Sequence, residues 1–335
     1  MKIIDMHCDT ISRIYQERLQ NKEVHLRKNS FQVDLLKMKA SHYLLQNFAL
    51  FIDLGESSRP YETFCSQLAL FREEMEKNSD LITPVTSYSD LIEQQRQGKM
   101  SALLTLEEGE ACCGSLDCLE EFYNMGIRMM TFTWNFQNSL GAPSEPAPFF
   151  LLKYPKLTNQ HIRQDQGLTP LGMEFLEKME RLGIIPDVSH LSDQGILDVC
   201  RLAKKPFCAS HSNARALCRR KRNLPDELIR CIAEHGGIIG ANYYGPFLSD
   251  IPDPHGRYFS QVADIAKHIR HMTDVGGISC VGLGSDFDGI DANLELENCS
   301  KMELLAQELK KHRFHEREID QIFHKNVLNF YRELL

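Results

Sequence analysis

Apolar and polar residues follow one another along this chain with two periods, one typical of strands and one typical of helices. Short apolar runs predict buried strands, and longer stretches with apolar residues three and four positions apart predict amphipathic helices. The clearest such helix is 61–77, with Phe64, Leu68, Phe71 and Met75 on one face. The eight predicted strand stretches are 3–10, 43–53, 101–106, 128–133, 184–190, 206–211, 237–242 and 277–284. The predicted helices between them are 11–19, 61–77, 89–97, 116–125, 169–182, a helix ending near 202, 225–235 and 259–273.

Strands that alternate with helices over this length predict an α/β fold, a (β/α)8 TIM-type barrel. The segment 134–168 has no sustained period and contains four prolines, so it predicts a long loop after the fourth strand. Helices are predicted from about residue 290 to the end of the chain. No Ser-, Gly- or Pro-rich linker divides the chain, and we therefore expect a single domain over residues 1–335.

Ligand-type residues stand where the predicted strands end. These residues are His7, Asp9, Glu107, His190, His211 and Asp286. Barrel enzymes carry their chemistry at the carboxyl ends of the strands, so the fold predicts that these side chains converge. Three imidazoles and three carboxylates suit one or two Zn²⁺ ions, with a carboxylate able to bridge a pair.

Composition and charge limit the classes of binding partner that we expect. The net charge of −8 disfavours a nucleic-acid surface and a polybasic membrane contact, which leaves small molecules as the expected partners. Eleven cysteines are scattered without a C-x-x-C pair, and several lie in apolar runs, as buried reduced cysteines do. No signal peptide and no apolar stretch of membrane-spanning length are visible, so a cytoplasmic location is expected.

Other motifs of enzyme chemistry are missing. The sequence has no H-E-x-x-H, no G-x-S-x-G, no P-loop and no G-x-G-x-x-G, which argues against serine hydrolysis and dinucleotide cofactors. The pairs His268 with His271 and His312 with His315 lie on charged helices, and we expect them on solvated faces.

The strand-end motifs resemble those of the renal or membrane dipeptidases, binuclear zinc peptidases of the amidohydrolase superfamily. The matching stretches span essentially the whole chain: 5–10, 106–109, 187–190, 210–212, 222–226 and 284–289. The resemblance implies that His7 and Asp9 bind one Zn²⁺, His190 and His211 the other, and that Glu107 bridges them. It also implies that Arg222 binds the terminal carboxylate of a dipeptide and that Asp286 is the acidic residue at the reacting centre.

The chain departs from this family after the fourth strand, where the family has a histidine that contacts the substrate. Trp134 takes this place and is followed by Asn135, and we assign both to substrate binding. Tryptophan offers one N–H donor and cannot act as a general acid. Electrostatic stabilisation of the oxyanion would therefore come from zinc, from Asn135 or from His161 of the long loop.

The function implied is hydrolysis of dipeptides to amino acids by a hydroxide that two zinc ions share, with Asp286 transferring the proton. Asp286 could instead be a further ligand or pair with Asp288. Alternatives for the whole protein are an amidohydrolase reaction on a cyclic amide, lactam, ester or N-acyl amino acid, or a metal-binding barrel without activity. A monomer and a homodimer are both compatible with the sequence.

Overall fold

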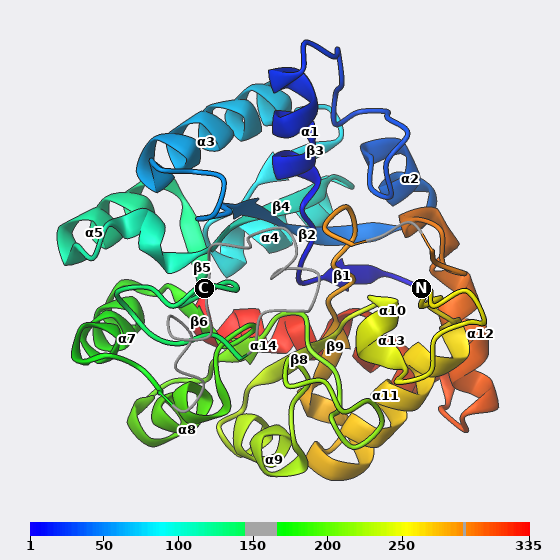
Figure 1. Cartoon of the computed structure of the whole chain (residues 1–335). Coiled ribbons are helices and arrows are strands. Elements are labelled where there is room, and N and C mark those ends of the chain that lie inside the picture. The colour runs from blue at the N-terminus through cyan, green and yellow to red at the C-terminus, as the bar shows by residue number, and fades with distance from the viewer. Residues whose placement is uncertain (145–165, 291–292) are drawn as a thin grey trace.

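The strands of the computed structural model, which describes residues 1–144, 166–290 and 293–335, form one parallel sheet that closes into a barrel (Figure 1). β1 pairs with both β2 and β9, and β2 pairs with β4, which completes the ring. The short β3 lies beside the first part of β4. The strands are β1 (Ile3–Asp5), β2 (Tyr43–Phe51), β3 (Ile82–Pro84), β4 (Met100–Glu107), β5 (Ile127–Thr131), β6 (Ile185–Asp187), β7 (Cys208–Ala209), β8 (Ile238–Ala241) and β9 (Val281–Leu283). The predicted (β/α)8 barrel is confirmed.

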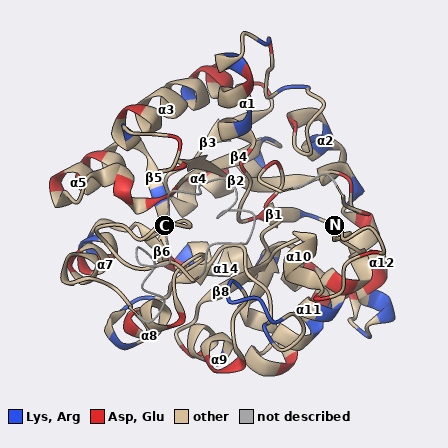
Figure 2. Ribbon diagram, viewed as in Figure 1, with Lys and Arg blue, Asp and Glu red and all other residues tan. Residues whose placement is uncertain are grey.

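Helices surround this barrel. They are α1 (Thr10–Leu19), α2 (Leu35–Ala40), α3 (Pro60–Lys77), α4 (Tyr88–Arg96), α5 (Leu116–Met125), α7 (Pro170–Leu182), α8 (Asp193–Leu202), α9 (Asp226–Glu234), α10 (Gly245–Leu248), α11 (Val262–Gly276), α12 (Glu303–Lys311), α13 (Glu316–Asp320) and α14 (Asn326–Leu334). The boundaries of α7 could be predicted from the sequence because both of its ends carry a capping residue. The Thr169 side chain accepts from the N–H of Gly172 at the start of the helix, and Gly183, with φ 90°, ends it. Figure 2 shows that the Lys, Arg, Asp and Glu positions of the chain lie mainly on this outer ring of helices.

Several predicted boundaries were wrong. β6 and β7 are shorter than the stretches 184–190 and 206–211, because the polar residues after them form turns rather than strand. β9 begins at Val281 since Ile278–Cys280 form a 3₁₀ turn, and α11 begins at Val262 rather than at 259. The sequence pattern also missed β3 and α2, which are too short for a clear period.

The amino end of the barrel is closed by α14. Val327, Phe330 and Tyr331 pack against inward-facing residues of the strands, which include Ile4, Leu45, Leu103, Met129, Ile185 and Ile238. The Nδ2 of Asn47 donates to the hydroxyl of Tyr331 at 2.8 Å. The opposite, carboxyl end of the barrel is therefore the end available for a site.

Cys200 of α8 and Cys231 of α9 form a disulfide. The expectation of reduced cysteines therefore does not hold for Cys200 and Cys231. Spacing along the sequence gave no sign of this disulfide, because the two helices meet only in the folded barrel. None of the helices within the described ranges is long and apolar enough to cross a membrane.

Candidate metal centre and substrate site

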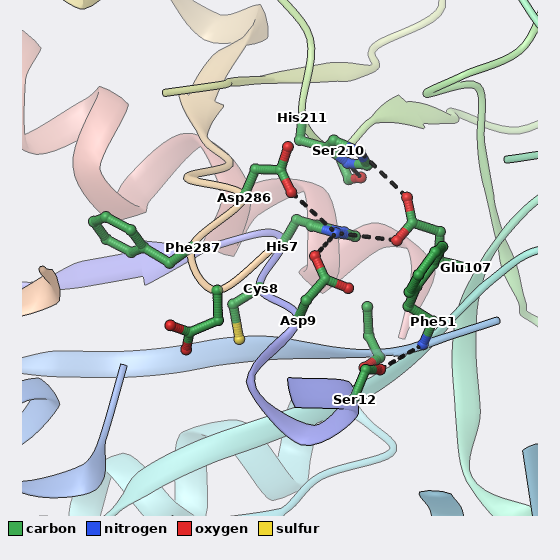
Figure 3. Close-up of polar contacts among 12 residues, drawn as sticks. His7, Cys8, Asp9, Ser12, Phe51, Glu107, Ser210, His211, Asp286 and Phe287 are labelled. Carbon is green, nitrogen blue, oxygen red and sulfur yellow. Dashed lines mark hydrogen bonds and ion pairs between the residues drawn. The ribbon is translucent and has the colours of Figure 1, made fainter. Parts of the chain in front are cut away.

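The six predicted strand-end residues meet at the carboxyl end of the barrel. Figure 3 shows His7, Asp9, Glu107, His211 and Asp286 with their polar atoms turned toward one another. The Nε2 of His7 lies 3.3 Å from Oδ2 of Asp9, 3.5 Å from Oε2 of Glu107 and 3.9 Å from Oδ1 of Asp286. The other oxygen of Glu107, Oε1, lies 3.0 Å from Nε2 of His190 and 3.5 Å from Nε2 of His211. The Glu107 carboxylate thus stands between two groups of ligand atoms.

Two buried aspartates hold the strand ends that carry these ligands. Asp5 accepts from the backbone N–H of His7 (3.3 Å) and from the N–H and hydroxyl of Ser285 (2.9 and 2.6 Å), so it joins the ends of β1 and β9. Asp187 accepts from the N–H of Ser189 and of Ser210, both at 2.9 Å, and so joins the ends of β6 and β7.

Left-handed backbone turns the ligands inward. His190 has φ 68° and Asp286 has φ 62°, a region that residues other than glycine rarely adopt. Such strained conformations concentrate at functional sites, where the surrounding structure maintains them.

The hydrogen bonds behind the histidines decide which ring nitrogens carry protons. The hydroxyl of Ser210 donates its one proton to Oδ2 of Asp187, and it therefore accepts from Nδ1 of His211 at 2.7 Å. Nδ1 of His190 donates to Oδ1 of Asn135 at 3.0 Å. Both Nε2 atoms are then left with lone pairs.

These lone pairs face each other. The two Nε2 atoms are 2.9 Å apart, and Glu107 is the nearest anion to both. Oδ1 of Asp9 is buried and has no hydrogen-bond partner among the described residues. Because lone pairs and carboxylates in contact repel one another unless a cation lies between them, the donor set fits metal ions. Among the described residues it forms three overlapping groups of three, and any two of these groups have one residue in common, which is His7, Glu107 or His211.

The charge states of His190, His211 and Glu107 agree with this arrangement. Burial, helped by the charge of Arg222, lowers the pKa of His190 to about 4, and burial with the charges of His7 and Arg222 holds the pKa of His211 well below its usual value. Burial opposes ionisation of Glu107, but the positive charge of His7 holds the pKa of Glu107 well below the ordinary range. Burial in turn opposes protonation of His7, but the carboxylates of Glu107 and Asp9 raise the pKa of His7 well above its usual value. Neutral imidazoles and an ionised carboxylate are the forms that bind metal.

Asp286 differs from the ligands around it. Burial raises its pKa to about 8, and the Asp9 and Glu107 carboxylates add to this effect. Its Oδ2 accepts from Nδ2 of Asn242 at 2.8 Å, while Oδ1 faces His7. Gly289 packs against it so closely that an added Cβ would lie 2.8 Å from Oδ1 of Asp286 and 2.1 Å from Oδ2 of Asp9. A side chain at residue 289 would therefore have to displace the carboxylates of Asp9 and Asp286.

Asp288, the alternative considered from the sequence, lies outside this centre. Its carboxylate accepts from the hydroxyl of Thr10 at 2.6 Å and from the N–H groups of Gln32 and Val33 at 2.7 and 3.2 Å. It ties the chain before α2 to the end of β9.

Arg222 lies beside the metal centre and is buried. Its Nη1 donates to the hydroxyl of Ser212 at 2.8 Å and its Nη2 to the carbonyl of His211 at 3.0 Å. Within the described ranges no carboxylate is within ion-pair distance of the guanidinium, and Nε has no hydrogen-bond partner. Burial lowers its pKa to about 10, which still leaves it charged at neutral pH. A buried cation in this state can bind an anionic group of a ligand.

Trp134 and Asn135 also lie at the centre. The indole packs edge-on against Phe51, with ring centroids 4.7 Å apart, and lies 6.2 Å from the His190 ring. Asn135 contacts the far side of His190, so it orients this ligand. The structure thus brings all nine predicted site residues together; His161 lies outside the described residues.

Sequence reasoning missed several residues that support the site. Asn242 ends the predicted strand 237–242 and could have been found by the rule that found the other strand-end residues. His268 was predicted on a solvated face, but it is buried: its Nδ1 accepts from the N–H of Ala214 and its Nε2 donates to the carbonyl of Leu248, both at 3.1 Å. Its helical spacing from Ile265 and Met272 places it on the apolar face of α11, and this was the signal to use.

Comparisons with known proteins agree with the geometry. The family described as Membrane dipeptidase (Peptidase family M19) matches residues 1–334. An uncharacterised dipeptidase of Schizosaccharomyces pombe is 27% identical over 351 residues, which cover 99% of this chain and 80% of the relative.

Solved structures share the fold. A metallo peptidase from Rhodobacter sphaeroides, liganded with a phosphinate mimic of the dipeptide L-Ala-D-Ala, has a TM-score of 0.85 at 23% identity and covers 100% of this chain and 99% of its own. The probable dipeptidase PvdM from Pseudomonas aeruginosa has a TM-score of 0.81 at 19% identity, with 97% and 98% covered. Since the family match extends over nearly every residue, this chain belongs to the membrane dipeptidase family, Peptidase family M19.

Proposed function

We propose that this protein hydrolyses dipeptides to free amino acids and uses two zinc ions to do so. The metallo-dipeptidase activity is that of its family, and the two zinc ions are what we propose in addition. The observation that carries the proposal is the Glu107 carboxylate, which lies between two groups of ligand atoms and close to a buried guanidinium. A substrate with a carboxylate near its scissile amide matches both features at once.

The residues divide between two metal positions. His7, Asp9 and Glu107 would hold one ion, and Glu107, His190 and His211 the other. Ions bound there would polarise the scissile carbonyl and lower the pKa of the attacking water.

The chain's own residues supply the proton transfer. Asp286 would take a proton from the attacking water and deliver it to the departing amine, because its Oδ1 faces the centre while Asn242 holds Oδ2. A carboxyl group with a pKa of about 8 retains a proton near neutral pH more readily than an ordinary aspartate, which suits the second of these steps.

Arg222 would set the length of the substrate. Its guanidinium would bind the terminal carboxylate, since it is charged, buried and without an ion-pair partner among the described residues. A peptide longer than two residues would place its carboxylate too far from the scissile bond.

The experiment is reconstitution of metal-free protein with zinc, followed by elemental analysis and assays. We expect about two zinc ions per chain and hydrolysis of dipeptides, with little cleavage of their C-terminal amides. Cyclic amides, lactams, esters and N-acyl amino acids are assayed beside them. The proposal would be contradicted if the protein cleaved one of these classes of compound but not dipeptides. Failure to bind zinc would also contradict it.

A further inference from the structure

Three aromatic side chains lie beside the candidate metal centre and are called here the aromatic wall: Phe51, Trp134 and Phe136. The ring centroids of Phe51 and Trp134 are 4.7 Å apart with planes at 67°, and those of Trp134 and Phe136 are 6.1 Å apart. The Trp134 ring is 6.2 Å from the ring of His190, a predicted metal ligand. The wall is therefore within reach of a molecule that reacts at the centre.

The pairing of the strands directs Phe51 into the mouth of the barrel. Phe51, the last residue of β2, is in register with Glu107, the last residue of β4. Residues paired in adjacent strands point to the same face of a sheet, so the Phe51 ring points the same way as the Glu107 carboxylate, as Figure 3 shows.

The backbone on both sides of the wall is held in place. The N–H of Phe51 donates to the hydroxyl of Ser12 at 2.8 Å, and its carbonyl accepts from Gln67 at 2.7 Å. The N–H of Trp134 donates to Oε2 of the buried Glu108 at 3.0 Å. The wall is thus a preformed surface, which binding need not order.

All three rings of the wall are partly exposed, although the ligands beside them are buried. Partly exposed aromatic surface next to a few convergent polar groups is typical of small-molecule sites. The rings carry no charge, and Trp134 offers a single N–H donor, so they provide no counter-ion for a charged group.

The order of the strands sets the direction of a substrate. Around the closed barrel the strands follow as β1, β2, β4, β5, β6, β7, β8 and β9, so β7, which precedes Arg222, lies opposite β2, which ends at Phe51. A dipeptide with its carboxylate at Arg222 and its scissile carbonyl at the metal centre would extend its amino-terminal residue toward the aromatic wall.

We propose that the aromatic wall binds the side chain of the amino-terminal residue of the dipeptide and selects apolar and aromatic side chains there. The inference rests on the proposed function and adds the substrate class. A negatively charged side chain would lose water at the wall without gaining a partner, whereas an apolar one would lose only unfavourable hydration. A positively charged side chain would lose water too, but the faces of the rings would attract it and offset part of this loss.

The first test is the native zinc-loaded protein on a panel of dipeptides that differ only in the first residue: Leu-Ala, Phe-Ala, Gly-Ala, Glu-Ala and Lys-Ala. We expect kcat/KM for Leu-Ala and Phe-Ala to exceed that for Glu-Ala by about 10–200-fold, the range for discrimination by an apolar pocket, and we expect Lys-Ala to lie between them because the rings attract its ammonium group. Equal kcat/KM over the panel would overturn the inference and leave the proposed function standing.

The second test uses Trp134→Ala with Tyr61→Ala as the matched control. Tyr61 also loses an aromatic contact, since its ring stacks on Phe122 at 5.8 Å, but it lies on the outer helix α3. We expect Trp134→Ala to lower kcat/KM for Leu-Ala by at least about 10-fold more than for Gly-Ala, and Tyr61→Ala to leave this ratio unchanged. Equal losses on the two substrates in Trp134→Ala would give Trp134 a structural role only and reject the inference.

The third test measures binding without turnover and without a variant. Trp134 is the one tryptophan of the sequence, so its fluorescence reports directly on the wall. We expect a phosphinate mimic of Leu-Ala to shift the emission to shorter wavelengths, because the leucine side chain displaces water from the indole, and a mimic of Gly-Ala to shift it less. Equal shifts would contradict the inference. If the Leu-Ala mimic shifts the emission but no dipeptide is cleaved, the proposed function fails and the wall remains a binding surface.

Discussion

Asp286 and Asp288 stand two residues apart, yet their carboxylates have different surroundings. Asp286 faces His7 and is held by Asn242, whereas Asp288 is occupied by Thr10 and by the backbone of Gln32 and Val33. The left-handed backbone at both residues, with φ 62° and 70°, points one side chain into the centre and the other away from it. Of these two carboxylates, Asp286 is therefore the one that faces the candidate metal centre.

Replacing Asp286 by asparagine tests this assignment. Because an amide keeps the shape but cannot take up a proton, we expect Asp286→Asn to lower kcat by about 100-fold or more and to retain metal. Elemental analysis and steady-state kinetics measure the two effects. Asp288→Asn is the control, for which we expect lower stability with metal content unchanged. Loss of one metal ion in Asp286→Asn would instead make Asp286 a ligand.

Arg222 is tested by its effect on substrates with and without a free carboxylate. We expect Arg222→Met to cost about 2–4 kcal/mol in kcat/KM on dipeptides, the range for removing one partner of a buried charged pair, and far less on their C-terminal amides. Arg220→Met is the matched control, since Arg220 lies on the same loop but donates to Tyr258 and Pro246. Similar losses on dipeptides and amides would contradict the carboxylate role.

At the scale of elements, close contact between β7, β8 and β9 places His211. A Cβ on Gly240 would lie 1.9 Å from the carbonyl oxygen of Ser210, and one on Gly284 would lie 1.8 Å from the same atom. Only glycine lets the neighbouring strands approach the residue before His211 this closely. α11 adds a second constraint, because His268 bonds both the chain after β7 and the end of α10.

His268 also predicts a dependence of stability on pH. Burial lowers its pKa to about 4, so the folded state favours the neutral ring. The pKa of His268 is lower in the folded chain than in the unfolded chain, where it is about 6.5, so its contribution to stability is fully present at pH values above 6.5. This contribution, at most about 3 kcal/mol, is lost as the pH falls from 6.5 toward 4.

We therefore expect His268→Gln to reduce the loss of unfolding free energy between pH 6.5 and 4.5, since glutamine is neutral throughout. Urea unfolding at several pH values measures the slope. His255→Gln is the control, because His255 is exposed. A slope unchanged from that of the native protein would show that His268 does not carry this dependence.

At the scale of the whole molecule, the two ends of the barrel have separate tasks. α14 closes the amino end with apolar side chains and the hydrogen bond between Tyr331 and Asn47, while the carboxyl end holds the predicted metal ligands. Closure through β1 with β9 and β2 with β4 brings His7 and Asp286, 279 positions apart in the numbering, to 3.9 Å. Stability and chemistry are therefore separable by mutation.

Tyr331→Phe tests this separation. Removing the hydroxyl leaves the buried Asn47 without this partner, so we expect the unfolding free energy to fall by about 1–3 kcal/mol with kcat/KM on dipeptides unchanged. Urea unfolding and activity assays measure both. If the double variant Asn47→Leu with Tyr331→Phe regained the lost stability, this would support the explanation. A large loss of kcat/KM in Tyr331→Phe with metal retained would argue against separate tasks for the two ends of the barrel.

Much of the fold was predictable from the sequence because local periods record which side of each segment is buried. α7 and α5 were predicted with their stops, and the eight barrel strands were each located. Boundaries failed where a strand ends in a turn, as at His190, since extended and left-handed backbone carry no distinct pattern of polarity. The ligand-type residues were found because an apolar run that stops at His, Asp or Glu is visible in one dimension.

The sequence by itself thus determined the alternation of elements, the chemistry of the strand ends and the resemblance to a family of metal-dependent dipeptidases. Only the tertiary structure decided that Asn135 contacts His190, that His268 is buried and that Phe51 meets Trp134. These contacts join residues far apart in the chain. They depend on the register and closure of the barrel, which no local pattern of hydrophobic and polar residues encodes.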